Sequence, residues 1–329
     1  MSWLNSTDLN TLIIMNKINQ NSKVLVTGAG GGLGKAVLSA LRSQGYQHVL
    51  SPTRQELDLL DSRAVEDYFS LHRPSAVIHL ASVVFGLLGN LENQMRSLME
   101  NSLINANIFS AICKYPVDYM FFAGTVAAYA YPYKNIPLIE KDFFDGLPHG
   151  GEFGYAMSKR HAYAYLKVLK DTQDFRFNYG VFTNLYGEND RFNDSSGHVI
   201  PSLIMKAYKA HKENLPFSVW GDGTAERDFL HFDDAAAAIL LCMECEQSSD
   251  IINISSGTAT TIRQLTELIC KQVGLTNIEF QTDKPVGIQS RVVNNTQLKA
   301  LGFSQSVDLE LGIQRLYRWY SENVIGVRA

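Results

Sequence analysis

Three residues in the middle of the chain have the types and the spacing for proton transfer at a carbonyl oxygen. Tyr155 and Lys159 lie four residues apart in the segment Y-A-M-S-K, so in a helix both side chains point to the same side. We expect the adjacent ammonium to lower the pKa of the Tyr155 phenol toward neutrality, which suits a proton donor or acceptor. Thr125 follows a predicted strand, where its hydroxyl could hold a substrate oxygen beside Tyr155. The set predicts reduction of a ketone or oxidation of an alcohol, although Y-x-x-x-K alone also occurs by chance in exposed helices.

A glycine-rich turn near the start of the chain is the predicted seat for cofactor phosphates. Residues 23–34, K-V-L-V-T-G-A-G-G-G-L-G, are typical of a buried strand, a tight turn and the start of a helix. Glycines let the main chain approach a pyrophosphate closely, and the helix N-terminus offers it free N–H groups. We therefore predict a dinucleotide cofactor. The residues expected to bind it here are Gly28, Gly30, Gly31, Gly32, Leu33 and Gly34.

The end of the second predicted strand indicates which dinucleotide binds. Sites that prefer NAD usually place a carboxylate there, which holds the ribose 2′-OH. In this chain residues 48–50 are followed by Ser-Pro-Thr and Arg54, and the first carboxylate is Glu56. Arg54 could pair with the 2′-phosphate of NADP, which a carboxylate would repel. We predict NADP(H), with a solvated loop charge as the alternative role for Arg54.

Length, charge and cysteine content exclude several classes of protein. The 329 residues, 46% of them hydrophobic, suffice for one large α/β domain and a smaller one. A net charge of −4 provides no basic surface, so we expect neither nucleic acid nor a membrane as a partner. Residues 1–20 lack a signal-peptide pattern, and Cys242 and Cys245 lack a second ligand pair for zinc. We expect a cytoplasmic protein without a metal.

Strands and helices alternate along most of the chain, which predicts a doubly wound parallel Rossmann sheet with helices on both faces. Asp61 and either Asp233 or Asp234 are expected to cap helices, and Thr261 with Gln264 fits a capping box. The segment from Asn184 onward is expected to be a polar loop. The expected strands are residues 24–26, 48–50, 76–80, 119–123, 177–183 and 251–255, and the expected helices include 33–42, 91–112, 155–169 and 199–211.

The order of elements also predicts how the chain divides. We expect an N-terminal extension over 1–22 and a dinucleotide-binding domain over 23–187, to which 228–256 return. Residues 188–227 and 257–329 are expected to form a smaller C-terminal α/β domain that binds the substrate. Ligands of open α/β sheets bind at the carboxyl ends of the strands, so the smaller domain should close over that edge.

Further segments, spread over nearly the whole chain after residue 22, resemble one family. They are T-R-Q-E-L-D-L-L-D (53–61), N-L-Y-G-E-N-D-R-F (184–192), S-G-H-V-I-P-S-L (196–203), V-W-G-D-G-T-A-E-R-D-F-L-H (219–231) and I-N-I-S-S-G (252–257). Together with the order of glycine turn, Thr125, Tyr155 and Lys159, they look like GDP-L-fucose synthase. That family belongs to the extended short-chain dehydrogenase/reductases of the NAD-dependent epimerase/dehydratase superfamily. Its members bind NADPH, take a GDP-4-keto-6-deoxy sugar, epimerise C3 and C5 and reduce C4.

The resemblance implies a role for each matching residue. Thr125 would orient the substrate, Tyr155 would donate the proton, and Lys159 would assist it and bind the cofactor ribose. His198 would be an acid/base for epimerisation, although a polar loop histidine is more often only solvated. Lys206, Trp220 and Arg227 would hold the nucleotide of the substrate, with Trp220 in the core and Lys206 on a solvated helix face as the alternatives. A homodimer is the expected assembly. The other implied contacts are Asp58, Leu59, Ala123, Gly124, Phe182, Asn184, Leu185 and His198 for the cofactor and Thr125 and Asn184 for the substrate.

Two departures from the family pattern change the predicted reaction. Two positions after the serine or threonine the family has a cysteine that acts as the other epimerisation base, and this chain has Ala127. The family's K-P-D-G becomes K-P-V-G, with Val286 in place of a carboxylate. Because alanine cannot move a proton, we predict an NADPH-dependent C4 ketoreductase of a GDP-linked 4-keto-6-deoxy hexose or heptose, with epimerisation impaired or absent.

Four alternatives remain. The first is a bifunctional GDP-L-fucose synthase in which the departures do not change the reaction. A sugar-nucleotide 4-epimerase, which recycles tightly held NAD, is disfavoured by the missing carboxylate after the second strand. A dehydratase would have an Asp-Glu pair where this chain has Val126 and Ala127. The intact set of Thr125, Tyr155 and Lys159 argues against a non-enzymatic dinucleotide sensor.

Overall fold

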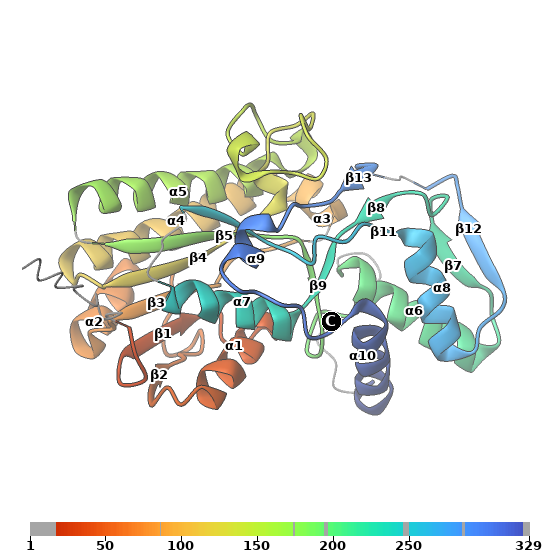
Figure 1. Ribbon diagram of the computed structural model, residues 1–329, viewed down its shortest axis with the longest axis horizontal. Helices are drawn as coiled ribbons and strands as arrows, with labels where there is room; N and C mark the ends of the chain where they lie inside the picture. Colours follow the sequence, from red (N-terminus) through yellow and green to blue (C-terminus); the bar gives the residue numbers. More distant parts are fainter. Residues whose placement is uncertain are drawn as a thin grey trace, which may run out of the picture.

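The computed structural model describes residues 18–85, 87–173, 175–193, 197–245, 250–284 and 287–324. Most of the expected N-terminal extension and Val286 therefore lie outside the described residues. Figure 1 shows two parts, a large one built around a sheet and a smaller one beside its strand ends.

A six-stranded parallel sheet forms the centre of the larger part, with the strand order β10-β5-β4-β3-β1-β2. Its core strands have apolar residues on both faces, as expected for a sheet covered on both sides. In β1, Val24 and Val26 pack into one apolar cluster and Leu25 into the other. This arrangement confirms the predicted fold class. The strands are β1 (Lys23–Thr27), β2 (His48–Leu50), β3 (Ala76–His79), β4 (Tyr119–Thr125), β5 (Arg176–Phe182) and β10 (Ile251–Ile254).

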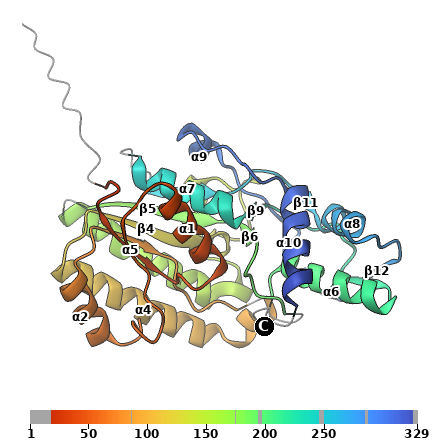
Figure 2. The same cartoon turned by 90° about the horizontal axis from the view of Figure 1, so that it is seen from below.

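Helices cover both faces of this sheet, as Figure 2 shows. On one face α1 (Gly32–Ser43) packs against α7 (Phe232–Glu244). On the other, α4 (Gln94–Lys114) lies between α2 (Ser62–His72) and α5 (Phe153–Thr172). Short segments complete this part: α3 (Leu87–Glu92) and the 3₁₀ turns η1 (Val126–Ala128), η2 (Glu140–Asp142) and η3 (Gly150–Glu152).

The smaller part has its own apolar core, shared by its helices and a two-stranded sheet. In Figure 1 the arrowheads of β4 and β5 point toward it, so it lies at the carboxyl edge of the large sheet. The proposed boundaries of the domains stay a prediction. The remaining elements are β6 (Asn184–Tyr186), α6 (Val199–Glu213), β7 (Phe217–Trp220), β8 (Glu226–Arg227), β9 (Phe229–His231), β11 (Thr260–Thr261), α8 (Ile262–Val273), β12 (Ile278–Gln281), β13 (Ser290–Arg291), α9 (Thr296–Ala300) and α10 (Leu309–Asn323).

Two of the helix caps predicted from the sequence are present in the structure. Asp61 accepts hydrogen bonds from the main-chain N–H groups of Arg63 and Ala64, which confirms it as the cap of α2. The capping box of Thr261 and Gln264 is also confirmed.

Two local predictions are wrong. Helix α7 begins at Phe232 and is capped by His231, whose Nδ1 accepts from Asp233 N, so both aspartates lie in the first turn instead. Residues 184–186, predicted as loop, form β6 because they pair with β9. None of the helices in the described ranges is long and apolar enough to cross a membrane.

Candidate active site

The turn between β1 and α1 has the shape of a phosphate seat. Gly28 has a φ of +71°, and a Cβ there would lie 2.8 Å from Ala81 N. A Cβ at Gly34 would collide with Gly28 O and one at Gly32 with the ring of Phe232, whereas Gly30 borders open space. At Gly31 no side chain caps α1, and the first turn contains no acidic residue. A diphosphate therefore fits against this helix N-terminus.

The segment after β2 carries the next predicted cofactor residues. The Arg54 side chain is 79% exposed, and its guanidinium lies 3.9 Å from the Asp58 carboxylate. An exposed contact of that length holds the arginine weakly, so Arg54 can reach a phosphate. Leu59 is partly buried, and its carbonyl accepts from Asn107 Nδ2 on α4 at 2.9 Å.

Thr125, Tyr155 and Lys159 lie together at the carboxyl end of β4. The hydroxyl of Thr125 is near enough to the phenol of Tyr155 to lower its pKa. Lys159 Nζ lies 5.7 Å from the centre of the Tyr155 ring and donates to the Ala123 carbonyl at 2.8 Å. The neighbouring Gly124 is needed there because a Cβ would collide with the ring of Tyr179. The structure therefore brings a phenol, a hydroxyl and an ammonium to one strand end.

The expected effect of Lys159 on Tyr155 is wrong. Burial, together with the charge of Glu152, raises the pKa of Tyr155 to about 12, although the hydroxyls of Ser82 and Thr125 act to lower it. The ammonium is itself buried, which lowers the pKa of Lys159 to about 7. Its Nζ donates to the Ala123 carbonyl and lies 4.9 Å from the centre of the Phe122 ring. Tyr155 is consequently protonated at neutral pH, as a proton donor must be.

Three predicted cofactor residues lie at and beyond the end of β5. Phe182 is buried in the same apolar cluster as Ala29 of the glycine turn. Asn184 Nδ2 donates to the Asp228 carbonyl at 3.0 Å. Leu185 pairs with Leu230 of β9. These contacts place the three residues at the same sheet edge as Thr125, which pairs with Phe182.

His198 is the residue before α6, and its ring is half-exposed. Its Nδ1 lies 3.3 Å from Asp190 Oδ1. Desolvation would lower the pKa of His198, but the hydrogen bond and charge of Asp190 outweigh it and raise the pKa. His198 is therefore held in a defined position by a carboxylate and can carry a proton near neutral pH.

Lys206, Trp220 and Arg227 all lie in the smaller part. Lys206 Nζ stands 4.9 Å from the Trp220 ring, which is partly exposed at the end of β7, so the two side chains form one surface. Arg227 donates to the Glu226 carbonyl at 2.7 Å. Burial, and then the nearby charge of Arg291, lower the pKa of Arg227 to about 10. A partly buried cation near a second one can bind an anionic ligand.

An ion pair that joins the two parts was not predicted from the sequence. Arg291 of β13 forms an ion pair with both carboxylate oxygens of Glu152 and donates from Nε to Tyr133 Oη at 2.9 Å. Glu152 directly precedes α5, the helix of Tyr155. No spacing rule relates residues this far apart, and the sequence carries no signal for the pair.

Ser82 was not predicted either, although its hydroxyl lowers the pKa of Tyr155 and donates to Asn101 Oδ1 at 2.8 Å. Ser82 follows the end of β3 as Thr125 ends β4. The rule that selected Thr125, a hydroxyl at the carboxyl end of a parallel strand, would have found it.

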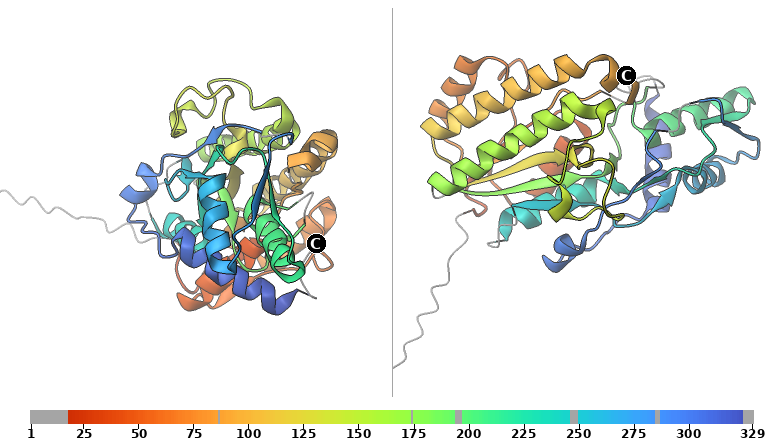
Figure 3. Two further views of the ribbon diagram at one scale, coloured as in Figure 1. Left: turned by 90° about the vertical axis from the view of Figure 1, so that its right-hand side faces the viewer. Right: turned by 90° about the horizontal axis from the view of Figure 1, so that it is seen from above.

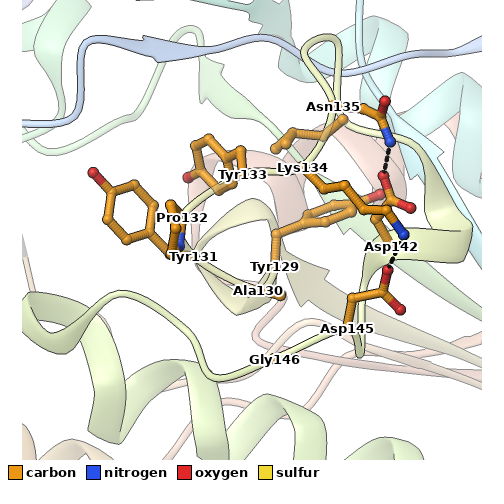
Figure 4. Close-up of a pocket in the computed structure, with 11 residues that line it drawn as sticks. Tyr129, Ala130, Tyr131, Pro132, Tyr133, Lys134, Asn135, Asp142, Asp145 and Gly146 are labelled. Atoms are coloured by element: carbon orange, nitrogen blue, oxygen red, sulfur yellow. Dashed lines mark hydrogen bonds and ion pairs between the residues drawn. The ribbon is translucent and has the colours of Figure 1, made fainter.

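A cavity of about 380 Å³ lies outside this cluster, in the loop after η1. Figure 4 shows its wall, where Asn135 contacts Asp142 and Lys134 contacts Asp145. None of the residues that line it belongs to the predicted site.

The two closely spaced cysteines do not form a metal site with other side chains that the structure describes. Cys242 is buried in α7 and Cys245 follows it. Among the described residues no three histidine, cysteine or acidic side chains gather as metal ligands.

The chain is similar in sequence and structure to proteins of one known family. The sequence pattern of the NAD dependent epimerase/dehydratase family matches residues 24–255. GDP-L-fucose synthase of Escherichia coli (strain K12) is 33% identical over 318 residues, covering 92% of this chain and 97% of that protein. The crystal structure of a GDP-L-fucose synthetase from Naegleria fowleri bound to NADP superposes with a TM-score of 0.87 at 28% identity, covering 95% and 96% of the two chains. A GDP-mannoheptose C4 reductase from Campylobacter jejuni with NADP bound gives 0.82 at 25% identity, covering 92% and 99%.

Proposed function

The chain belongs to the NAD dependent epimerase/dehydratase family, and we propose from this premise that it reduces the C4 ketone of a GDP-linked 4-keto-6-deoxy sugar. It is an NAD(P)-dependent oxidoreductase, and its cofactor is NADP(H), which similar solved structures hold. Its relatives include enzymes of GDP-fucose and of GDP-heptose synthesis. The sugar of this chain is accordingly a hexose or a heptose.

One observation carries the proposal: Tyr155, with its pKa raised to about 12, is available as a proton donor, whereas position 127 is an alanine. When bound, NADPH would supply the hydride for the carbonyl carbon. Tyr155, protonated because its pKa is raised to about 12, gives its proton to the carbonyl oxygen, and Thr125 holds that oxygen in place. Lys159, with a pKa of about 7, brings positive charge to the phenol as the proton leaves.

The glycine turn, Arg54 and Lys159 would hold the cofactor, with Asp58, Leu59, Ala123, Gly124, Phe182, Asn184, Leu185 and His198 around it. In the smaller part, Lys206 and Trp220 offer a cation and an exposed ring for the guanine nucleotide. Arg227 offers a partly buried charge for its diphosphate.

The test is incubation of the protein with NADPH and GDP-4-keto-6-deoxymannose, followed by NMR of the product. We expect NADPH to be consumed and C4 to be reduced with C3 and C5 unchanged. Absence of NADPH oxidation with hexose and heptose 4-ketones alike would reject the proposed function.

A bifunctional epimerase-reductase is the second candidate, and His198 favours it. Its hydrogen bond to Asp190 raises its pKa and orients its ring, as an acid/base for epimerisation requires. The same NMR experiment separates the candidates, because inversion at C3 and C5 changes the sugar coupling constants.

Arg54→Ala should raise the KM for NADPH about 10-fold and leave that for NADH nearly unchanged, because only NADPH carries the 2′-phosphate. Steady-state kinetics with both cofactors measures the difference. Arg63→Ala is the matched control, since Arg63 is an exposed arginine on the next helix. Equal changes for both cofactors would contradict the role of Arg54.

We also propose a homodimer, formed through α4 and α5. Leu91 of α3 and Met95, Met99 and Leu103 of α4 follow one another at intervals of four residues, and each is 47% to 67% exposed. Figure 3 shows α4 and α5 side by side on the outside of the large part. Soluble monomers rarely expose such a continuous apolar stripe.

Met99→Glu should convert a dimer to a monomer, because a carboxylate buried in an apolar interface loses its hydration. Size-exclusion chromatography with light scattering measures the mass. Leu71→Glu is the control, since Leu71 is 77% exposed on α2, outside the stripe. A wild-type chain that is monomeric at micromolar concentration would reject the dimer.

A further inference from the structure

The start of α5, the helix that carries Tyr155, is anchored to the smaller part by an ion pair. Glu152 is the residue before the helix, and both of its carboxylate oxygens accept from Arg291 of β13, one from Nη1 at 3.2 Å and the other from Nη2 at 2.5 Å. Arg291 Nε donates to Tyr133 Oη at 2.9 Å. Three bonds from one planar guanidinium fix both its position and its plane.

Helix capping does not explain this use of Glu152. A residue that precedes a helix usually bonds to the free N–H groups of the first turn, but the Glu152 side chain makes no such bond. The side chains of Glu152 and Arg291 are each only 12% exposed. Desolvation of two buried charges offsets much of their attraction, so stability alone is a weak reason for burying both.

The same turn of α5 is held from a second side by α4. Gln94 Nε2 donates to the Gly150 carbonyl, and Gln94 Oε1 accepts from Gly154 N, both at 2.8 Å. A Cβ at Gly154 would lie 2.2 Å from Gln94 O, so the two helices touch through their main chains. The first turn of α5 is therefore clamped between Gln94 of the large part and Arg291 of the smaller part.

Arg291 also has a fixed relation to the proposed nucleotide site. Strands β13 and β8 are parallel neighbours, and their register pairs Arg291 with Arg227. Arg227 is the arginine proposed above for the substrate diphosphate, whereas Glu152 compensates the charge of Arg291. The anchor of α5 and the contact to the nucleotide thus stand on one pair of strands.

We propose that Arg291 is a positioning residue for Tyr155, acting through Glu152 to set the start of α5 against the strands that hold the substrate diphosphate. The inference rests on the proposed function. Tyr155 lies in the first turn of α5, three residues after Glu152, so a shift of that turn moves the phenol relative to the ketone. Proton transfer requires donor and acceptor within hydrogen-bond reach, so misplacement affects turnover more than binding.

The double variant Glu152→Leu/Arg291→Met tests the proposal, because it replaces the buried pair with apolar side chains and leaves no unpaired charge. It should melt near the wild-type temperature, whereas either single variant buries a lone charge and should be less stable. We expect NADPH oxidation in a single turnover to slow about 10-fold, with the KM values for NADPH and the GDP-sugar nearly unchanged, since the pair carries no net charge.

Two kinetic outcomes would overturn the proposal. One is a wild-type rate in the folded double variant. The other is a rise in both KM values as large as the fall in rate, which indicates general disorder of the site. If the double variant does not fold, Arg291→Lys replaces it with the same expected signs, because lysine keeps the charge but cannot form all three bonds.

Hydrogen–deuterium exchange separates this inference from the choice of substrate. Without any substrate, the main-chain amides of residues 154–160 should exchange about 10-fold faster in the double variant, and those of 165–172 at the wild-type rate. Lys271→Gln/Glu310→Gln is the matched control, since it removes an exposed ion pair of the smaller part and should change neither exchange nor turnover. Unchanged exchange at 154–160 would refute the anchor. Faster exchange there, in a protein whose wild type reduces no GDP-4-keto sugar, would reject only the proposed function.

Discussion

Tyr155→Phe should lower kcat for ketone reduction by about 10²- to 10⁴-fold, the usual contribution of a positioned general acid. The substitution removes one oxygen and keeps the ring that packs near Lys159. Binding of NADPH should therefore change little, and the loss should fall on turnover rather than on affinity. Stopped-flow measurement of NADPH oxidation and fluorescence titration of NADPH binding give the two quantities.

Tyr165→Phe is the matched control for this variant. Tyr165 lies on the same helix, α5, and its ring stacks on Phe109 at 4.8 Å, so the change removes a hydroxyl at a distance from Thr125. We expect near wild-type turnover. If Tyr155→Phe were as active as this control, the proton donor would have to be another residue.

The second large effect concerns Ala127 and isotope exchange. Epimerisation at C3 and C5 requires a base that removes a proton beside the ketone and an acid that returns one on the other face. With alanine at position 127, only His198 of the implied pair can move a proton. Since such a group contributes about 10²- to 10⁴-fold, epimerisation should be far slower than reduction. In deuterated water the product should contain little deuterium at C3 or C5, as measured by NMR and mass spectrometry.

The packing around Ala127 limits how well a base can be introduced at this position. Ala127 is buried in η1, and its N–H donates to Thr125 Oγ1. Ala127→Cys adds a sulfur to a packed turn that also positions Thr125, so we expect partial exchange and some loss of reduction. Ala127→Ser, smaller and a poor base, is the control. Extensive deuterium at both carbons in the unmodified enzyme would establish the bifunctional alternative instead.

Sequence reasoning succeeded where the relevant contacts are local or follow a rule of the sheet. Tyr155 and Lys159 are neighbours because four residues make about one helical turn, and Thr125 reaches them because parallel strands end at one edge. The caps of α2 and α8 follow from side chains within three residues of each other.

It failed where the answer depends on burial or on distant partners. The spacing of Tyr155 and Lys159 gave the right proximity but the wrong direction for the phenol pKa, because desolvation exceeds the effect of an ammonium that is itself buried. Glu152 and Arg291 lie 139 residues apart, and their ion pair exists only once both parts have packed. The cap of α7 was misplaced because His231 also contacts Glu188, a partner that local sequence does not reveal.

The position of β10 in the sheet has a consequence for how the chain is made. β10 pairs with β5 along Tyr179–Phe182, yet the ribosome produces α6, β7, β8 and α7 between the two strands. During that interval the nascent sheet has an open hydrogen-bonding edge at β5, in which every residue after Arg176 is buried in the finished fold. Open edges of this kind recruit strands of other chains. Fragments that stop before Ile251 should therefore aggregate during synthesis, and slow translation of this stretch should increase dependence on chaperones.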